Sequence, residues 1–297
     1  MPYQEPEYLP WDGRRVPLTF IAGYLGAGKT SLINELLRTT RRPIAVLVND
    51  VGEVNIDARL IRRTHGDTIE LTDGCVCCSL SEGFGVAIDE LRAREQPPDH
   101  VVVELSGVAD PSRVLPWARS AGFRLDGVVT LVDIEQFDER VSDPLVGPAL
   151  AHQLAAADIV LATKTDLVDD QKAREVLSRV ADLTNGAPVV TSSNIGLASL
   201  LEIGGRDDIG TPALIEPSLF DPHVTDLIEL PCPIGRAEID TLLDGLGPNV
   251  VRAKGIAEDY DGDRWLIQVV GRRRDVSLLP AAEQEPPTGL VVISVPS

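Results

Sequence analysis

Three of the four cysteines, Cys75, Cys77 and Cys78, lie within four positions in the segment LTDGCVCCSL. An irregular loop opened by Asp73-Gly74 would let the three thiolates converge on one ion. Three thiolates suit Zn²⁺ or another thiophilic metal, and they leave the fourth coordination position for water or an outside ligand. A CxxC redox pair and buried structural cysteines are the alternatives. The spacing favours a metal site built for exchange.

A phosphate-binding loop is indicated by GYLGAGKT, which fits GxxxxGK[ST] between an apolar strand and an apolar helix pattern. Its glycines would let backbone N–H groups face phosphate oxygens at a helix N-terminus. Lys29 would reach the β and γ phosphates, and the Thr30 hydroxyl would hold Mg²⁺. The residues predicted to bind nucleotide here are Gly23, Gly26, Ala27, Gly28, Lys29, Thr30 and Ser31.

The segment HVVVELSG places an acid at the end of an apolar strand and a glycine three residues later. After a phosphate loop, this pattern is typical of the strand that brings a carboxylate to the Mg²⁺ shell. We therefore expect Glu104 to contact Mg²⁺ and Gly107 to contact the γ-phosphate.

The base is predicted from ATKTDL, in which Thr163, Lys164 and Asp166 follow a buried strand. The Asp166 carboxylate can accept hydrogen bonds from N1–H and the 2-amino group of guanine, whereas adenine offers neither donor. The Lys164 stem would lie along the base plane. Thr163 stands where GTPases usually have Asn, and Ser192 lies in the TSSN segment expected beside the guanine. GTP is preferred to ATP, which disfavours a small-molecule ATP-dependent kinase.

The residue that orients the hydrolytic water is less evident. Many small GTPases have Gln directly after the glycine that corresponds to Gly107, and this chain has Val108. Asp50 or Glu53 would take that role, beside Lys29, Thr30 and Glu104 as the other catalytic residues. We expect slow hydrolysis that depends on a partner, a metal or a dimer.

Short apolar strands alternate with helical stretches through the first two thirds of the chain, which predicts a parallel sheet with helices on both faces. The predicted strands are Leu18–Ala22, Ile44–Asn49, Val101–Leu105, Val128–Val132, Ile159–Ala162 and Val189–Thr191. The predicted helices are Thr30–Arg38, Ser81–Arg94, Pro111–Ser120 and Asp170–Leu183.

The pattern changes after about Leu200, where a segment rich in Gly, Pro and Asp indicates a linker. A smaller α+β domain follows, with one helix at Ile234–Leu246 and strands at Val224–Leu230, Val250–Ala257, Arg264–Val270, Asp275–Leu279 and Leu290–Val295. The predicted organisation is an extension (1–15), a P-loop NTPase domain (16–204), a linker (205–222) and a C-terminal domain (223–297).

The composition limits the classes of partner and the cell compartment that we expect for this protein. With 27 Lys and Arg against 46 Asp and Glu, the formal net charge is −19, which argues against a nucleic-acid partner. No apolar run approaches membrane-span length, and the start shows no signal-peptide pattern, so we expect a cytoplasmic protein with reduced thiols. Cys232 is interpreted as a small buried residue, and Arg272–Arg274 as a solvated strand end.

In this order the motifs resemble the CobW-like family of P-loop GTPases, relatives of the urease and hydrogenase nickel-insertion GTPases. The segments that carry the resemblance are GYLGAGKTSLIN, VNDVGEVNID, LTDGCVCCSL, VVVELSGVADP, LVD at Leu131–Asp133, ADIVLATKTDL, RAKGI and RWLIQVVG. The chain departs from the family in Asp50-Val51, where Glu-Phe is usual, in Thr163, and in having only four histidines and no His-rich stretch.

The resemblance implies a GTPase domain, a CobW-type C-terminal α+β domain and a role in metal delivery or insertion, most often of zinc. It also implies that Cys75, Cys77 and Cys78 hold the metal, with Glu53 as a further ligand or switch residue. The expected function is a GTP-hydrolysing metallochaperone that uses GTP, GDP and Mg²⁺ and delivers Zn²⁺ to a client metalloprotein. The alternative is a nucleotide-locked scaffold for a cobalt or iron enzyme, with little intrinsic hydrolysis. A homodimer is kept open as a second kind of partner.

Overall fold

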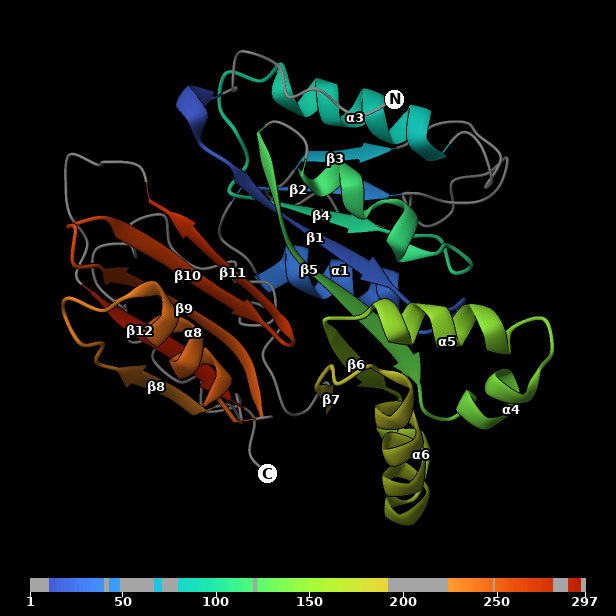
Figure 1. Ribbon diagram of the computed structural model, residues 1–297. Helices are drawn as coiled ribbons and strands as arrows, with labels where there is room; N and C mark the ends of the chain where they lie inside the picture. Colours follow the sequence, from blue (N-terminus) through green and yellow to red (C-terminus); the bar gives the residue numbers. More distant parts are fainter. Residues whose placement is uncertain are drawn as a thin grey trace.

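Two sheets organise the chain in the computed structural model, and each carries helices (Figure 1). The structure describes residues 11–39, 43–48, 67–70, 80–119, 122–191, 224–247, 249–279 and 288–294. The first sheet has seven parallel strands in the order β3-β2-β4-β1-β5-β6-β7. These are β1 (Val16–Ala22), β2 (Ile44–Val48), β3 (Asp67–Glu70), β4 (His100–Glu104), β5 (Phe123–Asp133), β6 (Ile159–Thr163) and β7 (Val189–Thr191).

Helices cover both faces of this sheet. They are α1 (Lys29–Thr39), α3 (Leu80–Arg92), α4 (Phe137–Ser142), α5 (Gly147–Ala156) and α6 (Asp170–Leu183). The short 3-10 helices are η1 (Trp11–Gly13), η2 (Pro111–Arg113), η3 (Leu115–Arg119) and η4 (Thr165–Leu167). The predicted parallel sheet with helices on both faces is confirmed, while β3, α4 and α5 are additions to the prediction.

The predicted helix Pro111–Ser120 is wrong, because the chain forms η2 and η3 there. Pro116 has no N–H to donate within a continuous α-helix. The turn closes instead through a bond from the N–H of Val114 to the carbonyl of Pro111 (3.1 Å). Asp110 caps the start of η2, since its carboxylate accepts the Ser112 N–H at 2.9 Å.

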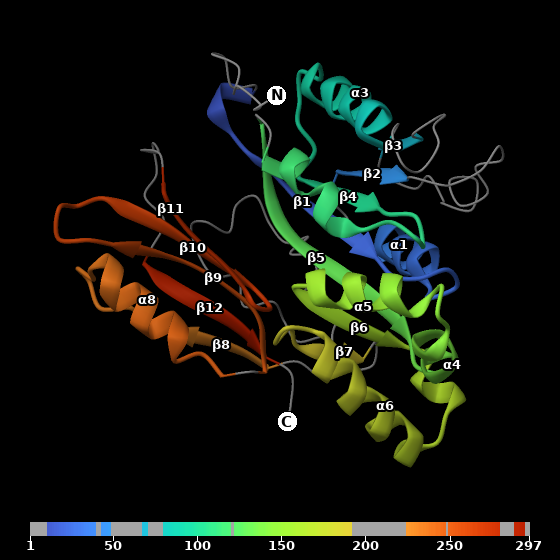
Figure 2. The same cartoon turned by 45° about the vertical axis from the view of Figure 1, so that its right-hand side comes forward.

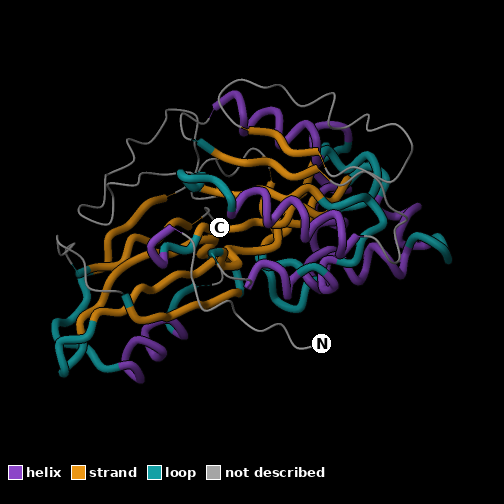
Figure 3. Tube along the Cα trace, turned by 90° about the horizontal axis from the view of Figure 1, so that it is seen from above, coloured by secondary structure: helices purple, strands orange, loops and turns teal. Residues whose placement is uncertain are grey.

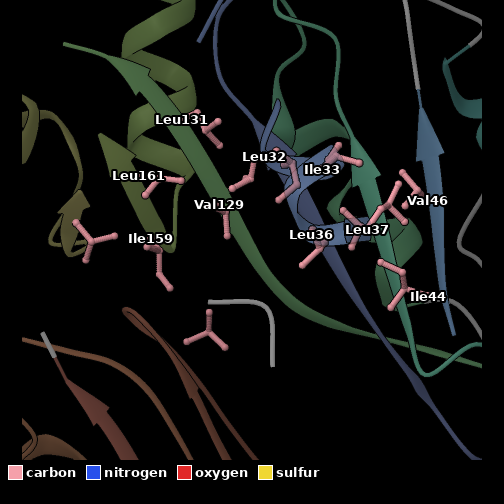
Figure 4. Packing of buried hydrophobic residues seen from close by; sticks show 14 of the residues in the cluster. Leu32, Ile33, Leu36, Leu37, Ile44, Val46, Val129, Leu131, Ile159 and Leu161 are labelled. Atoms are coloured by element: carbon pink, nitrogen blue, oxygen red, sulfur yellow. The ribbon is translucent and has the colours of Figure 1, made fainter. Parts of the chain in front are cut away.

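The core lies on both faces of the first sheet because its central strands are apolar throughout. Every residue of β2 and β4 is buried. Figure 4 shows Leu32, Ile33, Leu36 and Leu37 of α1, which share a buried cluster with strand residues such as Val46 and Val129 and have the spacing that places them on one side of a helix. The opposite face packs against α3 and η3, and the end of the sheet at β5 and β6 packs against α4, α5 and α6.

The second sheet is antiparallel, with the order β11-β10-β9-β12-β8 (Figure 2). Its strands are β8 (Val224–Ile228), β9 (Val250–Glu258), β10 (Arg264–Val270), β11 (Arg273–Leu278) and β12 (Gly289–Ser294), and α8 (Arg236–Asp244) covers one face. This confirms the smaller α+β domain. The boundaries at 204 and 222 lie outside the described residues, so the domain limits stay a prediction.

The two sheets share a continuous core, and Figure 3 views the strands of both from above. Val251, Val270 and Ile293 of the second sheet belong to the same buried cluster as α1. No helix in the described part of the chain is long and apolar enough to cross a membrane.

A buried ion pair joins the sheets at Asp126. Strand β5 has an extra residue at this point, since Leu18 is opposite Leu125 and Thr19 is opposite Gly127. Such a bulge re-aims the side chain of the extra residue. Both carboxylate oxygens of Asp126 accept a hydrogen bond from Nη2 of Arg252, at 3.0 and 3.1 Å. The exposed fractions of the two side chains are 2% and 5%.

A second contact between the sheets revises the interpretation of Arg272–Arg274 as a solvated strand end: Arg272 and Arg274 are exposed as expected, but Arg272 and Arg273 also contact the first domain. Nε of Arg273 donates to Asp158 at 2.8 Å, and Nη2 of Arg272 donates to the carbonyl of Ala155 at 2.8 Å. Arg274 contacts its own domain instead, where it pairs with Asp244 at the end of α8. The expectation that Cys232 is buried is also wrong, because its thiol is free and the residue is exposed.

We predict that Arg252→Met lowers the free energy of unfolding by about 3 kcal/mol, because it leaves the buried Asp126 carboxylate without its main cation. The double variant Arg252→Met/Asp126→Leu should recover most of the loss. The control Arg38→Met removes an exposed pair with Glu35 and should cost less than about 0.5 kcal/mol. Urea unfolding curves measure all three, and equal losses for Arg252 and Arg38 would contradict the buried-pair account.

Burial raises the pKa of the Asp158 carboxyl above its usual range, and Arg273 and Arg272 offset only part of this effect. The folded state therefore holds the Asp158 proton more tightly than the unfolded state. The stabilisation is fully present below the unfolded pKa of about 3.9 and is lost as pH rises through the folded pKa. We predict that wild type loses stability relative to Asp158→Asn as pH rises through this window. Urea curves of both proteins at stepped pH measure the difference, and a difference independent of pH would contradict the prediction.

Candidate nucleotide site

The predicted site residues that the structure describes lie at one edge of the first sheet, because β4, β1, β5 and β6 are neighbours in a parallel sheet. The carboxyl ends of such strands meet at one edge, which is where ligands bind in open α/β sheets. Strand β1 leads into the phosphate loop there, and β4 ends in Glu104. Strand β5 ends in Asp133, and β6 ends in Thr163.

The loop between β1 and α1 has the geometry of a phosphate cradle. Gly23, Gly26 and Gly28 adopt φ angles of 135°, 76° and 98°, which residues with a side chain rarely adopt. The loop ends where α1 begins at Lys29, so helix N–H groups face the space that the loop encloses. Nζ of Lys29 is buried and donates to the carbonyl of Gly23 at 2.9 Å.

The residues predicted to hold Mg²⁺ lie together. The Thr30 hydroxyl donates to Oε1 of Glu104 at 3.2 Å, which joins the start of α1 to the end of β4. A hydroxyl and a carboxylate are hard oxygen ligands of the kind that Mg²⁺ prefers. The donor set therefore fits Mg²⁺ beside a bound nucleotide.

The base-recognition segment is anchored to its neighbours through two side chains. The Thr163 hydroxyl lies 2.9 Å from the carbonyl of Ala27 in the phosphate loop and 3.1 Å from the carbonyl of Val132 in β5. Lys164 adopts a left-handed backbone conformation (φ 59°), and its Nζ donates to Asp133 at 2.8 Å. Asp166 follows in η4 with an exposed side chain. A carboxylate in this position is open to a ligand.

Two residues at this edge were absent from the predicted site. Asp133 is buried and accepts the backbone N–H groups of Glu135 and Gln136 while it pairs with Lys164. The Arg140 guanidinium lies 3.8 Å from Asp133 and 5.2 Å from the ring centroid of Tyr24 in the phosphate loop. The acid at the end of LVD was the available signal for Asp133, whereas Arg140 lies in a short helix that the sequence pattern did not indicate.

Six of the predicted site residues stay predictions. Asp50, Glu53, Cys75, Cys77, Cys78 and Ser192 lie outside the described residues. Within the described ranges, no group of three or more His, Cys, Asp or Glu residues could hold a metal. Ser31 is exposed on α1, and Val108 is exposed beside Gly107.

Comparisons with known proteins agree with the motifs. The family model described as CobW/HypB/UreG, nucleotide-binding domain, matches residues 17–191. The zinc chaperone CobW of Sinorhizobium sp is 32% identical over 88% of this chain and 87% of its own length. The zinc chaperone YjiA of Escherichia coli (strain K12) is 29% identical over 94% of each chain. The solved structure of Zn(II)-bound YjiA GTPase from E. coli aligns over 95% of each chain, with 24% identity and a TM-score of 0.48.

We predict that Thr163→Val weakens GTP and GDP equally, by about fivefold to tenfold, because it removes one neutral hydrogen bond that fixes the base segment to the phosphate loop. Thr241→Val in α8 is the matched control, since that hydroxyl bonds only to its own helix at Ala237. Equilibrium titration with fluorescent nucleotides measures both variants. Unchanged affinity in Thr163→Val would show that the bridge does not position the site.

Proposed function

Because the chain belongs to the CobW/HypB/UreG nucleotide-binding family, we propose that it is a GTP-hydrolysing metallochaperone. In this proposal Cys75, Cys77 and Cys78 carry zinc as cargo, and the protein delivers it to a client metalloprotein. The relatives named zinc chaperones support zinc over cobalt or iron. A cytoplasmic location and a homodimer belong to the same proposal.

The observation that carries the nucleotide part is the contact between Thr30 and Glu104 at the edge where the base segment also lies. The phosphate loop would hold the phosphates, and Lys29 would turn from the Gly23 carbonyl to the β and γ phosphates. Asp166 would select guanine by accepting from N1–H and the 2-amino group. Mg²⁺ held by Thr30 and Glu104 would neutralise charge on the phosphates.

Hydrolysis then needs a group that positions water. Val108 is exposed and cannot orient water by hydrogen bonding, so we assign this role to Asp50 or Glu53. Both residues follow β2 in the chain, and β2 lies directly beside β4, which carries Glu104. Gly107 would donate its backbone N–H to the γ-phosphate.

The metal part is supported by the register of the sheet. Glu70 at the end of β3 is opposite Val48 of β2, and Val48 is opposite Glu104 of β4. Two strand spacings of about 4.8 Å therefore place the end of β3 about 10 Å from Glu104. Cys75 comes five positions after Glu70, and a fully extended chain of five residue steps spans about 17 Å at most. The thiols are thus within reach of an edge that senses the nucleotide.

A nucleotide-locked scaffold is the second candidate, and Val108 in place of a water-orienting Gln favours it. A scaffold would bind GTP without turning it over. Phosphate release from the purified protein, with and without zinc, separates the two functions.

We predict that zinc binding and GTP binding strengthen each other by a common factor, because linkage makes the coupling reciprocal. Zinc affinity should fall at acid pH, since free thiols titrate near about 8.5 and bind metal as thiolates. Anaerobic titrations of zinc with and without GTP, and of GTP with and without zinc, measure the coupling.

Cys77→Ser should abolish the zinc dependence while GTP remains preferred to ATP. Cys232→Ser is the matched control, because this exposed thiol lies in the second domain. If Cys77→Ser and wild type show the same zinc dependence, the cargo site lies elsewhere. If ATP binds as tightly as GTP, the role of Asp166 is wrong.

A further inference from the structure

Helix α5 holds a buried glutamine against the loop that follows β4. Gln153 is 1% exposed, and its Nε2 donates to the carbonyls of Gly107 and Ala109 at 3.2 and 2.9 Å. Both partners are acceptors, so the amide nitrogen, not the oxygen, must face them. The glutamine thus fixes the backbone of the loop on both sides of Val108.

This loop is pressed against the phosphate loop. A Cβ on Gly107 would lie 2.7 Å from the backbone nitrogen of Leu25 and equally near its side chain, so no larger residue fits without movement. The carbonyl that Gln153 holds and the N–H expected to meet the γ-phosphate belong to the same residue, Gly107. A shift of this residue toward the phosphate must therefore change its bond to Gln153.

Two buried oxygens beside the loop have no hydrogen-bond partner in the described residues. They are Oγ of Ser106 and Oε1 of Gln153. Buried polar atoms are nearly always satisfied, so such a pair calls for an explanation. Ser106 belongs to the segment 106–109 and Gln153 packs against it, as expected if a second arrangement of this segment supplies their partners.

The C-terminal end of α5 is held by the second sheet. Two residues after Gln153, the carbonyl of Ala155 accepts from Nη2 of Arg272 at 2.8 Å. The chain then reaches Asp158, which pairs with Arg273. Helix α5 therefore contacts the loop that follows β4 along its side and the second domain at its end.

We propose that Gln153 is a positioning residue for the γ-phosphate: it holds the backbone of the loop after β4 so that the Gly107 N–H meets the γ-phosphate. We also propose that α5 links this loop to the second domain. The proposal rests on the GTP-dependent function proposed above and deepens it by naming the residue that reads the nucleotide state. GDP lacks the γ-phosphate, so the effect of Gln153 falls on GTP. A glutamine with a purely structural role would affect both nucleotides alike.

The first experiment compares Gln153→Met with the control His152→Ala, an exposed neighbour on the same helix. We expect the ratio of GDP to GTP-analogue dissociation constants to fall about tenfold in Gln153→Met, which is the loss of roughly two neutral hydrogen bonds. GDP affinity and the control should change less than about twofold. Equal weakening of both nucleotides, or an unchanged ratio, overturns the positioning role.

Gln153→Asn keeps an amide at shorter reach and serves as the conservative variant. Partial recovery of the ratio relative to Gln153→Met supports positioning, and no recovery at equal thermal stability contradicts it. If Gln153→Met fails to fold, the positioning role is tested instead by amide hydrogen exchange of residues 104–110 in the wild-type protein. These amides and α5 should exchange differently with the GTP analogue than with GDP, and identical exchange overturns the proposal.

The second experiment tests the link to the second domain with the variant Arg272→Ala. Arg272 contacts the end of α5 at the edge of the first sheet opposite to the nucleotide edge. We expect a partial fall in the nucleotide ratio that is less than additive with Gln153→Met. Arg274→Ala is the control, because Arg274 pairs with Asp244 inside the second domain. If Arg272→Ala leaves the nucleotide ratio unchanged, or if its effect adds fully to that of Gln153→Met, the proposed link through α5 is wrong. Failure of wild type to bind GTP at all would instead refute the proposed function.

Discussion

The central position of β1 is the constraint on which the other features depend. This strand is hydrogen-bonded to β4 on one side and β5 on the other, and nearly all its residues are buried. Because the sheet is parallel, the ends of these three strands are forced to one edge. The phosphate loop, Glu104 and Asp133 are neighbours for this reason alone, although more than 100 residues separate the first from the last. Any change that shifts β1 in its register would displace all three.

The opposite edge of the sheet binds the second domain. Asp126 and Asp158 lie at the amino ends of β5 and β6, and both carboxylates meet arginines of the second sheet. Asp126 and Asp133 are seven residues apart in β5, or about 23 Å. Buried ion pairs often add little net stability compared with apolar residues, but an orientation that separates the partners leaves a buried charge unpaired, which is strongly unfavourable. The arginines therefore serve to fix how the second domain sits, and α5 runs between the two edges.

The sequence pattern predicted the elements whose apolar residues are continuous or regularly spaced, including six strands of the first sheet and all five of the second. It missed β3, which has only four residues, and α5, which opens with Gly147-Pro148 and resembles a turn. Long-range contacts were also beyond its reach. Nothing local to Arg273 indicates a partner 115 residues away, and an isolated Gln153 carries no motif. The motif residues of the phosphate loop were predictable because their chemistry is local.

Thr163 illustrates how a departure from the usual pattern can be tolerated. A hydroxyl has one proton, which Thr163 shares between the carbonyls of Ala27 and Val132, whereas an Asn amide could donate one proton to each. The missing bond is offset by the adjacent ion pair, in which Lys164 reaches buried Asp133. Asp133 is in turn fixed by two backbone N–H groups. The base segment is therefore anchored to β5 by charge and to the phosphate loop by one shared proton, so the phosphate loop is the more weakly held of the two.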